Sequence, residues 1–104
     1  MAETKMEELA QQLLSQTKAR KVEWEKFGRR GETEFRLVFP GGYFTIYEGD
    51  GHRLILGDLA GTVTVLDSED FPDSTETLEE IYRLAEEQIK DRGIEKAFEF
   101  LKNR

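Results

Sequence analysis

The middle of the chain, from Val22 to Leu66, consists of short runs in which apolar and polar residues alternate, separated by turns rich in glycine. Such alternation is typical of β-strands with one buried face, because successive side chains of a strand point to opposite sides. Short connections favour antiparallel neighbours, since parallel pairing needs a crossover of about a dozen residues or more. The pattern therefore predicts an antiparallel meander, and it restricts the fold more than any other feature.

We expect five strands in this meander. The first runs from Lys21 to Phe27 and carries the only tryptophan, Trp24, on its buried side as an anchor for the core. A turn at residues 28–31 follows it. The remaining strands are expected at residues 35–39, 43–48, 53–56 and 62–66, and turns that contain proline, glycine or aspartate separate them.

An amphipathic helix is expected before the strands. Thr4 and Glu7 have the spacing of a capping box, in which each side chain can bond to a free backbone N–H at the start of a helix. From there to Thr17, apolar residues recur at steps of three and four. This periodicity predicts a helix from Thr4 to about Ala19.

Two more helices are expected after the strands. Beyond Pro72, Asp73 or Thr75 can cap a helix whose apolar stripe extends to Ile89. Gly93 is typical of the residue that stops a helix, so a short final helix should follow it. We therefore predict one α+β domain over residues 1–104: an N-terminal helix, a five-stranded antiparallel meander and two C-terminal helices packed on one sheet face.

Alternation also assigns the strand residues to the two faces of the sheet. The covered face should carry Phe35, Leu37, Phe39, Phe44, Ile46, Leu54, Leu56, Val63 and Val65. The open face would then carry Arg36, Val38, Tyr43, Thr45, Tyr47, Arg53, Ile55, Thr62, Thr64 and Leu66. Tyrosine and arginine are enriched at binding hot spots, although tyrosine and threonine are also simply good strand formers. We predict Arg36, Tyr43, Tyr47 and Arg53 as the binding residues.

The apolar members of the open face predict self-association. Leaving them in water is unfavourable, and a two-fold dimer would bury the same patch twice. We expect a homodimer through this face or through the sheet edges, with the helices as the alternative interface. Another protein is the other expected partner.

Charge and composition exclude several classes of function. The net charge is −7, and residues 67–92 hold ten acidic against three basic residues, so general nucleic-acid binding is not expected. The chain has no cysteine, which removes thiol nucleophiles, disulfides and zinc or iron–sulfur sites with thiolate ligands. No signal peptide or membrane-spanning run is visible, so a cytoplasmic protein with no membrane association is expected.

Catalytic and metal motifs are weak throughout the chain. His52 is the only histidine, and no nucleophile motif accompanies it. The acidic run after Asp67 fails as an EF-hand, because its sixth position is Pro72 and its twelfth is Leu78. The paired glycines are followed by neither Lys-Ser/Thr nor a helix, unlike a phosphate-binding loop. We expect no enzymatic activity, no cofactor and no metal.

The order of elements resembles a scattered set of small uncharacterised prokaryotic proteins. The resemblance rests on the Val22-Glu23-Trp24 strand, Gly61 in the last hairpin, and the Leu-Glu-Glu-Ile-Tyr-Arg-Leu-Ala helix followed by a short helix at Gly93. It implies an α+β fold and carries no activity. We interpret the chain as a small acidic module for protein binding or assembly. The alternatives are an accessory protein of a mobile element or toxin system, whose acidic helix occupies a basic partner, and, less favoured, a small enzyme using His52.

Overall fold

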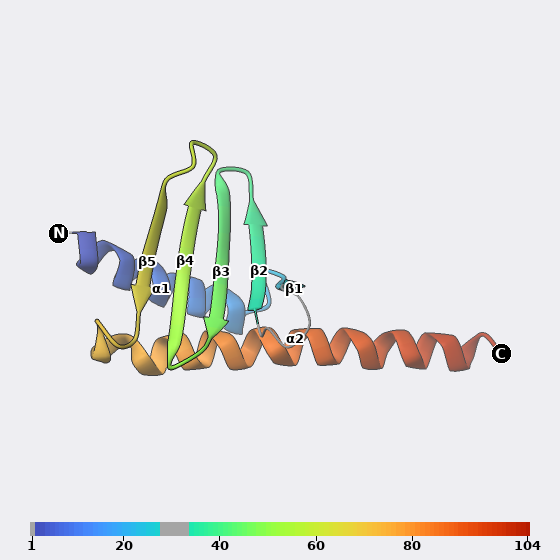
Figure 1. Ribbon diagram of the computed structural model, residues 1–104. Coiled ribbons are helices and arrows are strands. Elements are labelled where there is room, and N and C mark those ends of the chain that lie inside the picture. Colours follow the sequence, from blue (N-terminus) through green and yellow to red (C-terminus); the bar gives the residue numbers. More distant parts are fainter. Residues whose placement is uncertain (1, 28–33) are drawn as a thin grey trace.

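The computed structural model of the chain describes residues 2–27 and 34–104, with side chains from Lys5 onward (Figure 1). The turn expected at residues 28–31 lies outside the described residues. The elements follow in the order α1 (Ala2–Lys18), β1 (Glu25–Phe27), β2 (Glu34–Phe39), β3 (Gly42–Glu48), β4 (His52–Asp58), β5 (Val63–Asp67), a 3-10 turn (Pro72–Ser74) and α2 (Thr75–Lys102). This is the α+β order that the alternation predicts.

The five strands form one sheet in which neighbours in sequence are neighbours in space. The strand order is β1-β2-β3-β4-β5, and every pairing is antiparallel, so the predicted meander is confirmed. Phe44 on the central strand β3 pairs with Leu37 on one side and with Leu56 on the other. These three apolar residues therefore share one face of the sheet.

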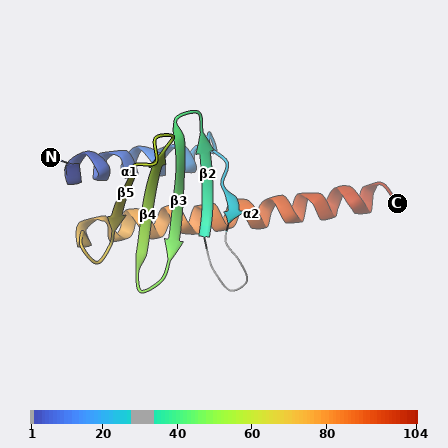
Figure 2. The ribbon, with the colours of Figure 1, turned by 45° about the horizontal axis from the view of Figure 1, so that its top comes forward.

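Figures 1 and 2 show the strands passing in front of both helices, which run across the strands. Side chains from the helices and the sheet form a single buried cluster, and the rings of Phe35 on β2 and Tyr82 on α2 have centroids 5.2 Å apart. The cluster consists of Met6, Ala10, Leu13, Leu14, Trp24, Phe35, Phe44, Ile46, Leu54, Leu66, Leu78, Ile81, Tyr82 and Ala85.

The predicted faces of the last strand are wrong. Leu66 pairs with the buried Leu54 and is itself fully buried, whereas Val63 and Val65 are exposed on the other face. In the sequence Val-Thr-Val-Leu, both alternating positions contain apolar residues, so alternation alone does not decide which side faces the core. The pairing of β5 with β4 decides it.

The first strand is also shorter than predicted. Only Glu25–Phe27 pair with β2, and Trp24 lies just before the strand. Side chains of α2 take its backbone groups instead: the N–H of Trp24 donates to Gln88 Oε1 at 2.9 Å, and its carbonyl accepts from Arg92. Trp24 is fully buried, and its indole N–H donates to Thr17 Oγ1 of α1 at 3.1 Å. Trp24 is therefore buried as expected. Hydrogen bonds to side chains of the two helices hold it, rather than backbone hydrogen bonds to a neighbouring strand.

The two predicted C-terminal helices are a single helix. α2 runs for 28 residues through Gly93 and projects beyond the sheet, and the molecule accordingly measures 56 × 29 × 28 Å (Figure 1). A glycine inside a helix costs only about 1 kcal/mol relative to alanine, whereas starting a new helix requires another costly nucleus. None of the described helices is both long and apolar enough to span a membrane.

Both predicted helix starts differ from the structure. α1 begins at Ala2, which places the expected cap Thr4 inside the helix. α2 begins at Thr75 with Ser74 in the cap position, and a 3-10 turn that contains Asp73 precedes it. The hydroxyl of Ser74 donates to Glu7 Oε2 of α1 at 3.4 Å rather than to its own helix. A contact between the helices has replaced the local cap.

Trp24→Ala should lower the free energy of unfolding by about 3–5 kcal/mol, because it leaves a large cavity in the core and removes the indole hydrogen bond to Thr17. Chemical denaturation measures this loss. As a matched surface control, Leu59→Ala at a position 83% exposed should change stability by no more than about 0.5 kcal/mol. Equal effects of the two substitutions would contradict the anchor role of Trp24.

Gly93→Ala should stabilise the end of α2 by up to about 1 kcal/mol, because alanine fits a continuous helix and an added Cβ at this position meets no atom within 4 Å. Far-UV circular dichroism should show equal or higher helix content, and amide exchange after residue 93 should slow. A glycine that ended the helix in a left-handed conformation would give the opposite result, a destabilised protein.

Candidate functional site

The four predicted binding residues lie on one face of the sheet. Arg36 shares its side of β2 with Val38, which pairs with Tyr43, and Tyr47 pairs with Arg53 on β4. This open face is opposite the buried cluster. The sequence therefore places these side chains on a common surface correctly, while their role in binding stays a prediction. A homodimer through this face also stays a prediction.

An aromatic and cationic stack crosses the open face. The guanidinium carbon of Arg36 lies 3.6 Å from the ring centroid of Phe27 and 4.4 Å from that of Tyr43. Tyr43 in turn covers Gly57, where an added Cβ would approach the tyrosine ring to 2.3 Å. Cation–π contacts of this kind hold the arginine head against both rings. Arg36 and Tyr43 are thus ordered by the sheet itself, and Phe27 at the end of β1 joins them.

The other two predicted residues lie toward the opposite end of the face. Arg53 forms an ion pair with Asp67 across β4 and β5, with its Nη2 2.9 Å and its Nε 3.1 Å from the same carboxylate oxygen. The N–H of Glu69 donates to the other oxygen of Asp67 at 2.9 Å. The hydrogen bond from Glu69 and the charge of Arg53 together hold the pKa of Asp67 below its ordinary value, against the opposing effect of desolvation. The Arg53 head is therefore occupied within its own sheet.

His52 begins β4, one residue before the start of the predicted strand at residues 53–56. Its Nε2 is 3.4 Å from Glu48 Oε2, its side chain is only 14% exposed, and its ring centroid is 5.3 Å from that of Tyr82. The N–H of His52 is bonded to Ser68 Oγ at 3.0 Å. These contacts give the residue a packing position at the end of the sheet, next to a polar cleft of 290 Å³ that includes Tyr47 and Arg53.

The acidic segment of α2 pairs internally and with α1. Arg83 contacts Glu80 and Glu87, and Lys90 contacts Glu86 within the helix. Two basic residues at and just after the end of α1 form ion pairs with the same helix: Lys18 with Glu80 at 3.6 Å and Arg20 with Asp91 at 3.2 Å. Much of the local charge is therefore already compensated. Among the described residues no group of three or more side chains is arranged to hold a metal ion.

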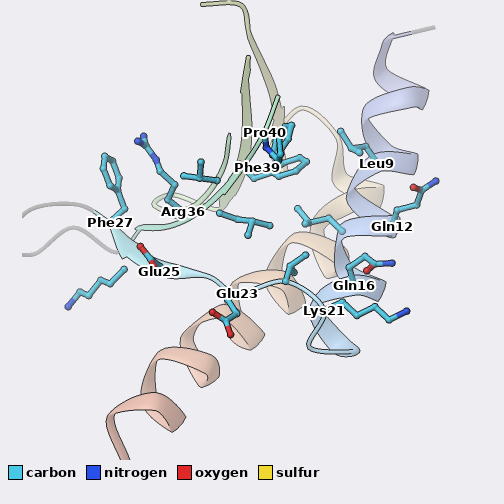
Figure 3. Close-up of a pocket in the computed structure, with 16 residues that line it drawn as sticks. Leu9, Gln12, Gln16, Lys21, Glu23, Glu25, Phe27, Arg36, Phe39 and Pro40 are labelled. Carbon is cyan, nitrogen blue, oxygen red and sulfur yellow. The ribbon is translucent and has the colours of Figure 1, made fainter. Parts of the chain in front are cut away.

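A larger apolar groove lies at the edge of the sheet, where the sequence suggested no site. It has a volume of 660 Å³ and runs between α1 and β2 (Figure 3). In Figure 3, Phe39 and Pro40 on the sheet side face Leu9 on the helix across this space. Its floor is apolar and its rim carries both charges; the lining is Leu9, Gln12, Leu13, Gln16, Lys21, Val22, Glu23, Glu25, Lys26, Phe27, Arg36, Leu37, Val38, Phe39, Pro40 and Phe44.

The same groove contains an open strand edge. β1 pairs only with residues Glu34–Arg36 of β2, so the stretch from Leu37 to Phe39 has no paired strand on its outer side among the described residues. Backbone N–H and C=O groups of successive strand residues point to alternate sides. At least one of these three residues therefore presents both groups to the groove. Because the helix and strand that form it are distant in the sequence, no local motif could have located this site.

The comparisons with known proteins give no guidance on function. No family model, no curated protein and no solved structure matches this chain. The resemblance to small prokaryotic proteins stays a prediction, and function must be argued from the geometry of the site alone.

Asp67→Asn should make the stability less sensitive to acid. The folded-state pKa of Asp67 is depressed, so its carboxylate contributes stability above its unfolded pKa of about 3.9, and this contribution is lost as the pH falls through the folded value. The gap in the free energy of unfolding between wild type and Asp67→Asn should therefore be full above about pH 5 and should narrow as the pH falls below the unfolded pKa and through the depressed folded pKa. Urea titrations across this range measure it, with Asp70→Asn as the control for removing an exposed charge. A gap that is independent of pH would contradict the proposed contribution.

Proposed function

We propose that this protein is a binding module that takes an extended segment of a partner protein along the open edge of β2. The observation that carries the proposal is the coincidence of two features in one place: an apolar groove of 660 Å³ and a strand edge that β1 leaves uncovered from Leu37 to Phe39. Neither feature alone specifies a ligand. Together they fit a β-strand, whose backbone pairs with an edge while alternate side chains enter a pocket.

The backbone part of the interaction follows from the shortness of β1. With only three residues, it covers half of the six-residue strand β2. An exposed edge is a ready template for another strand, and proteins usually protect such edges. Here the uncovered part ends at Pro40, so an added strand would pair over a short stretch and depend on the groove for further affinity.

The groove supplies the side-chain part. Leu37 and Phe39 are only partly buried and pack against the core cluster from the groove side, and Leu9 does the same from α1. Partly covered apolar side chains around a concavity favour an apolar ligand side chain. The rim carries Lys21 and Glu23. These two side chains would contact the polar residues that alternate with the apolar residues of the bound strand.

The predicted residue Arg36 borders the groove, and its position supports a role in orientation. Its guanidinium is fixed between Phe27 and Tyr43, and its Nε makes no hydrogen bond within the part of the chain that the structure describes. This Nε is buried, so the remaining N–H groups of the guanidinium are the ones placed beside the groove to donate to a carbonyl or carboxylate of the ligand. The acidic face of α2 provides less support for a basic partner, because several of its carboxylates already pair with Arg83, Lys90 and Lys18.

Selection of displayed random peptides on the protein tests the proposal. Enriched peptides should contain apolar and β-branched residues that alternate with polar ones, and their binding should perturb the amide resonances of residues 37–39 and of α1. Gln12→Trp places a bulky ring in the groove from an exposed position and should weaken binding by about tenfold or more.

The matched control is Ser15→Trp, an exposed position of the same helix that does not line the groove; it should leave peptide affinity within about twofold. Two results would overturn the proposal: enriched peptides that bind both tryptophan variants equally well, or resonance changes confined to the far end of the sheet near Arg53 and Asp67.

A further inference from the structure

The last part of α2 presents an apolar surface that its own domain does not cover. Ile94 is 54% exposed, Phe98 62%, Phe100 61% and Leu101 63%, and all residues from Gly93 onward are exposed. Figure 1 shows this end of the helix extending past β1, the last strand on that side of the sheet. Three large apolar side chains on one face at spacings of three and four are typical of a helix that packs against something.

This stripe does not continue the face of α2 that packs in the core. At about 100° per residue, Ile94, Phe98 and Leu101 lie on roughly the opposite side of the helix from Ile81 and Ala85, which are fully buried. Bending the helix back toward its own sheet would therefore bring the wrong face to the core. The stripe requires a partner outside the domain.

We propose that this stripe binds the same stripe of a second copy of the chain, as an antiparallel helix pair. The charges beside it are self-complementary: Glu95 and Lys102 lie seven positions apart and thus on the same flank of the stripe. In an antiparallel two-fold pair, each flank faces the same flank of the partner with its direction reversed. Glu95 of one copy then lies beside Lys102 of the other, and the contact occurs twice.

The projection of α2 leaves room for this arrangement. The paired ends overlap beyond the sheet, so the two domains lie at opposite ends of the helix pair. The interface is small, because the outer face of α2 before Ile94 carries charged residues such as Arg83, Glu87 and Lys90. An interface below about 1,200 Å² is typical of weak association. We therefore expect a dimer with a dissociation constant of about 10–100 µM.

Sedimentation equilibrium at low ionic strength tests the pair. Phe98→Glu places a charge at the centre of the stripe and should weaken the dimer by at least about tenfold. Lys96→Glu, on the other side of the helix, is the matched control and should stay within about twofold. Circular dichroism should show that both variants keep the fold, because these residues lie outside the core.

A charge exchange tests the direction of the helices. Glu95→Lys alone and Lys102→Glu alone each create two like-charge contacts and should weaken the dimer by about fivefold. The double variant, with both substitutions, restores opposite charges and should return the dissociation constant to within about twofold of wild type.

Four results would overturn the proposal. A wild-type chain that remains monomeric at about 1 mM excludes the dimer. A dimer unchanged by Phe98→Glu has its interface elsewhere, for example on the open face of the sheet. A double variant whose dissociation constant does not return to that of wild type excludes the antiparallel pairing of Glu95 with Lys102. A monomer that binds vesicles of anionic phospholipid, and loses this binding in Phe98→Glu, assigns the stripe to a lipid surface instead.

Discussion

Trp24 is fully buried where the two helices and the sheet meet, and much of the rest of the structure depends on how it is held. Thr17 of α1 accepts from its indole, while Gln88 and Arg92 of α2 bond to its backbone. Gln88 also donates to the carbonyl of Val22, so one side chain satisfies two backbone groups of the segment that enters the sheet. This segment is thereby attached to the helices before it reaches β2. Its attachment explains why β1 is so short and why, among the described residues, none pairs with the outer side of residues 37–39.

The uncovered surfaces of the molecule follow from this arrangement. The face of the sheet opposite the buried cluster is stabilised from within by the stack of Phe27, Arg36 and Tyr43 and by the ion pair of Arg53 with Asp67. Three of the residues that the sequence marked for binding, Arg36, Tyr43 and Arg53, thus already have partners on this face. The groove beside β2 and the projecting end of α2 are two further surfaces that carry uncovered apolar side chains.

The differences between the predicted and the observed structure share a physical origin. The face of β5 was ambiguous because Val63, Val65 and Leu66 are all apolar, and only pairing with β4 resolved it. The strand around Trp24 was predicted too long because alternation does not reveal that Gln88, far away in sequence, takes its backbone hydrogen bond. The break at Gly93 was predicted from a local preference of about 1 kcal/mol, which helix propagation overcomes.

Local patterns in the chain suffice to predict the order of helix, antiparallel meander and helix, the burial of Trp24, and the common face of Arg36, Tyr43, Tyr47 and Arg53. These properties depend on periodicity and on short turns, which act over a few residues. Contacts between distant segments are what create the groove between α1 and β2, the hydrogen bonds that hold Trp24, the orientation of β5 and the isolation of the stripe around Phe98. Each of these features depends on which segments, distant in the sequence, come into contact and on how much of each other's surface they bury. No local pattern contains that information.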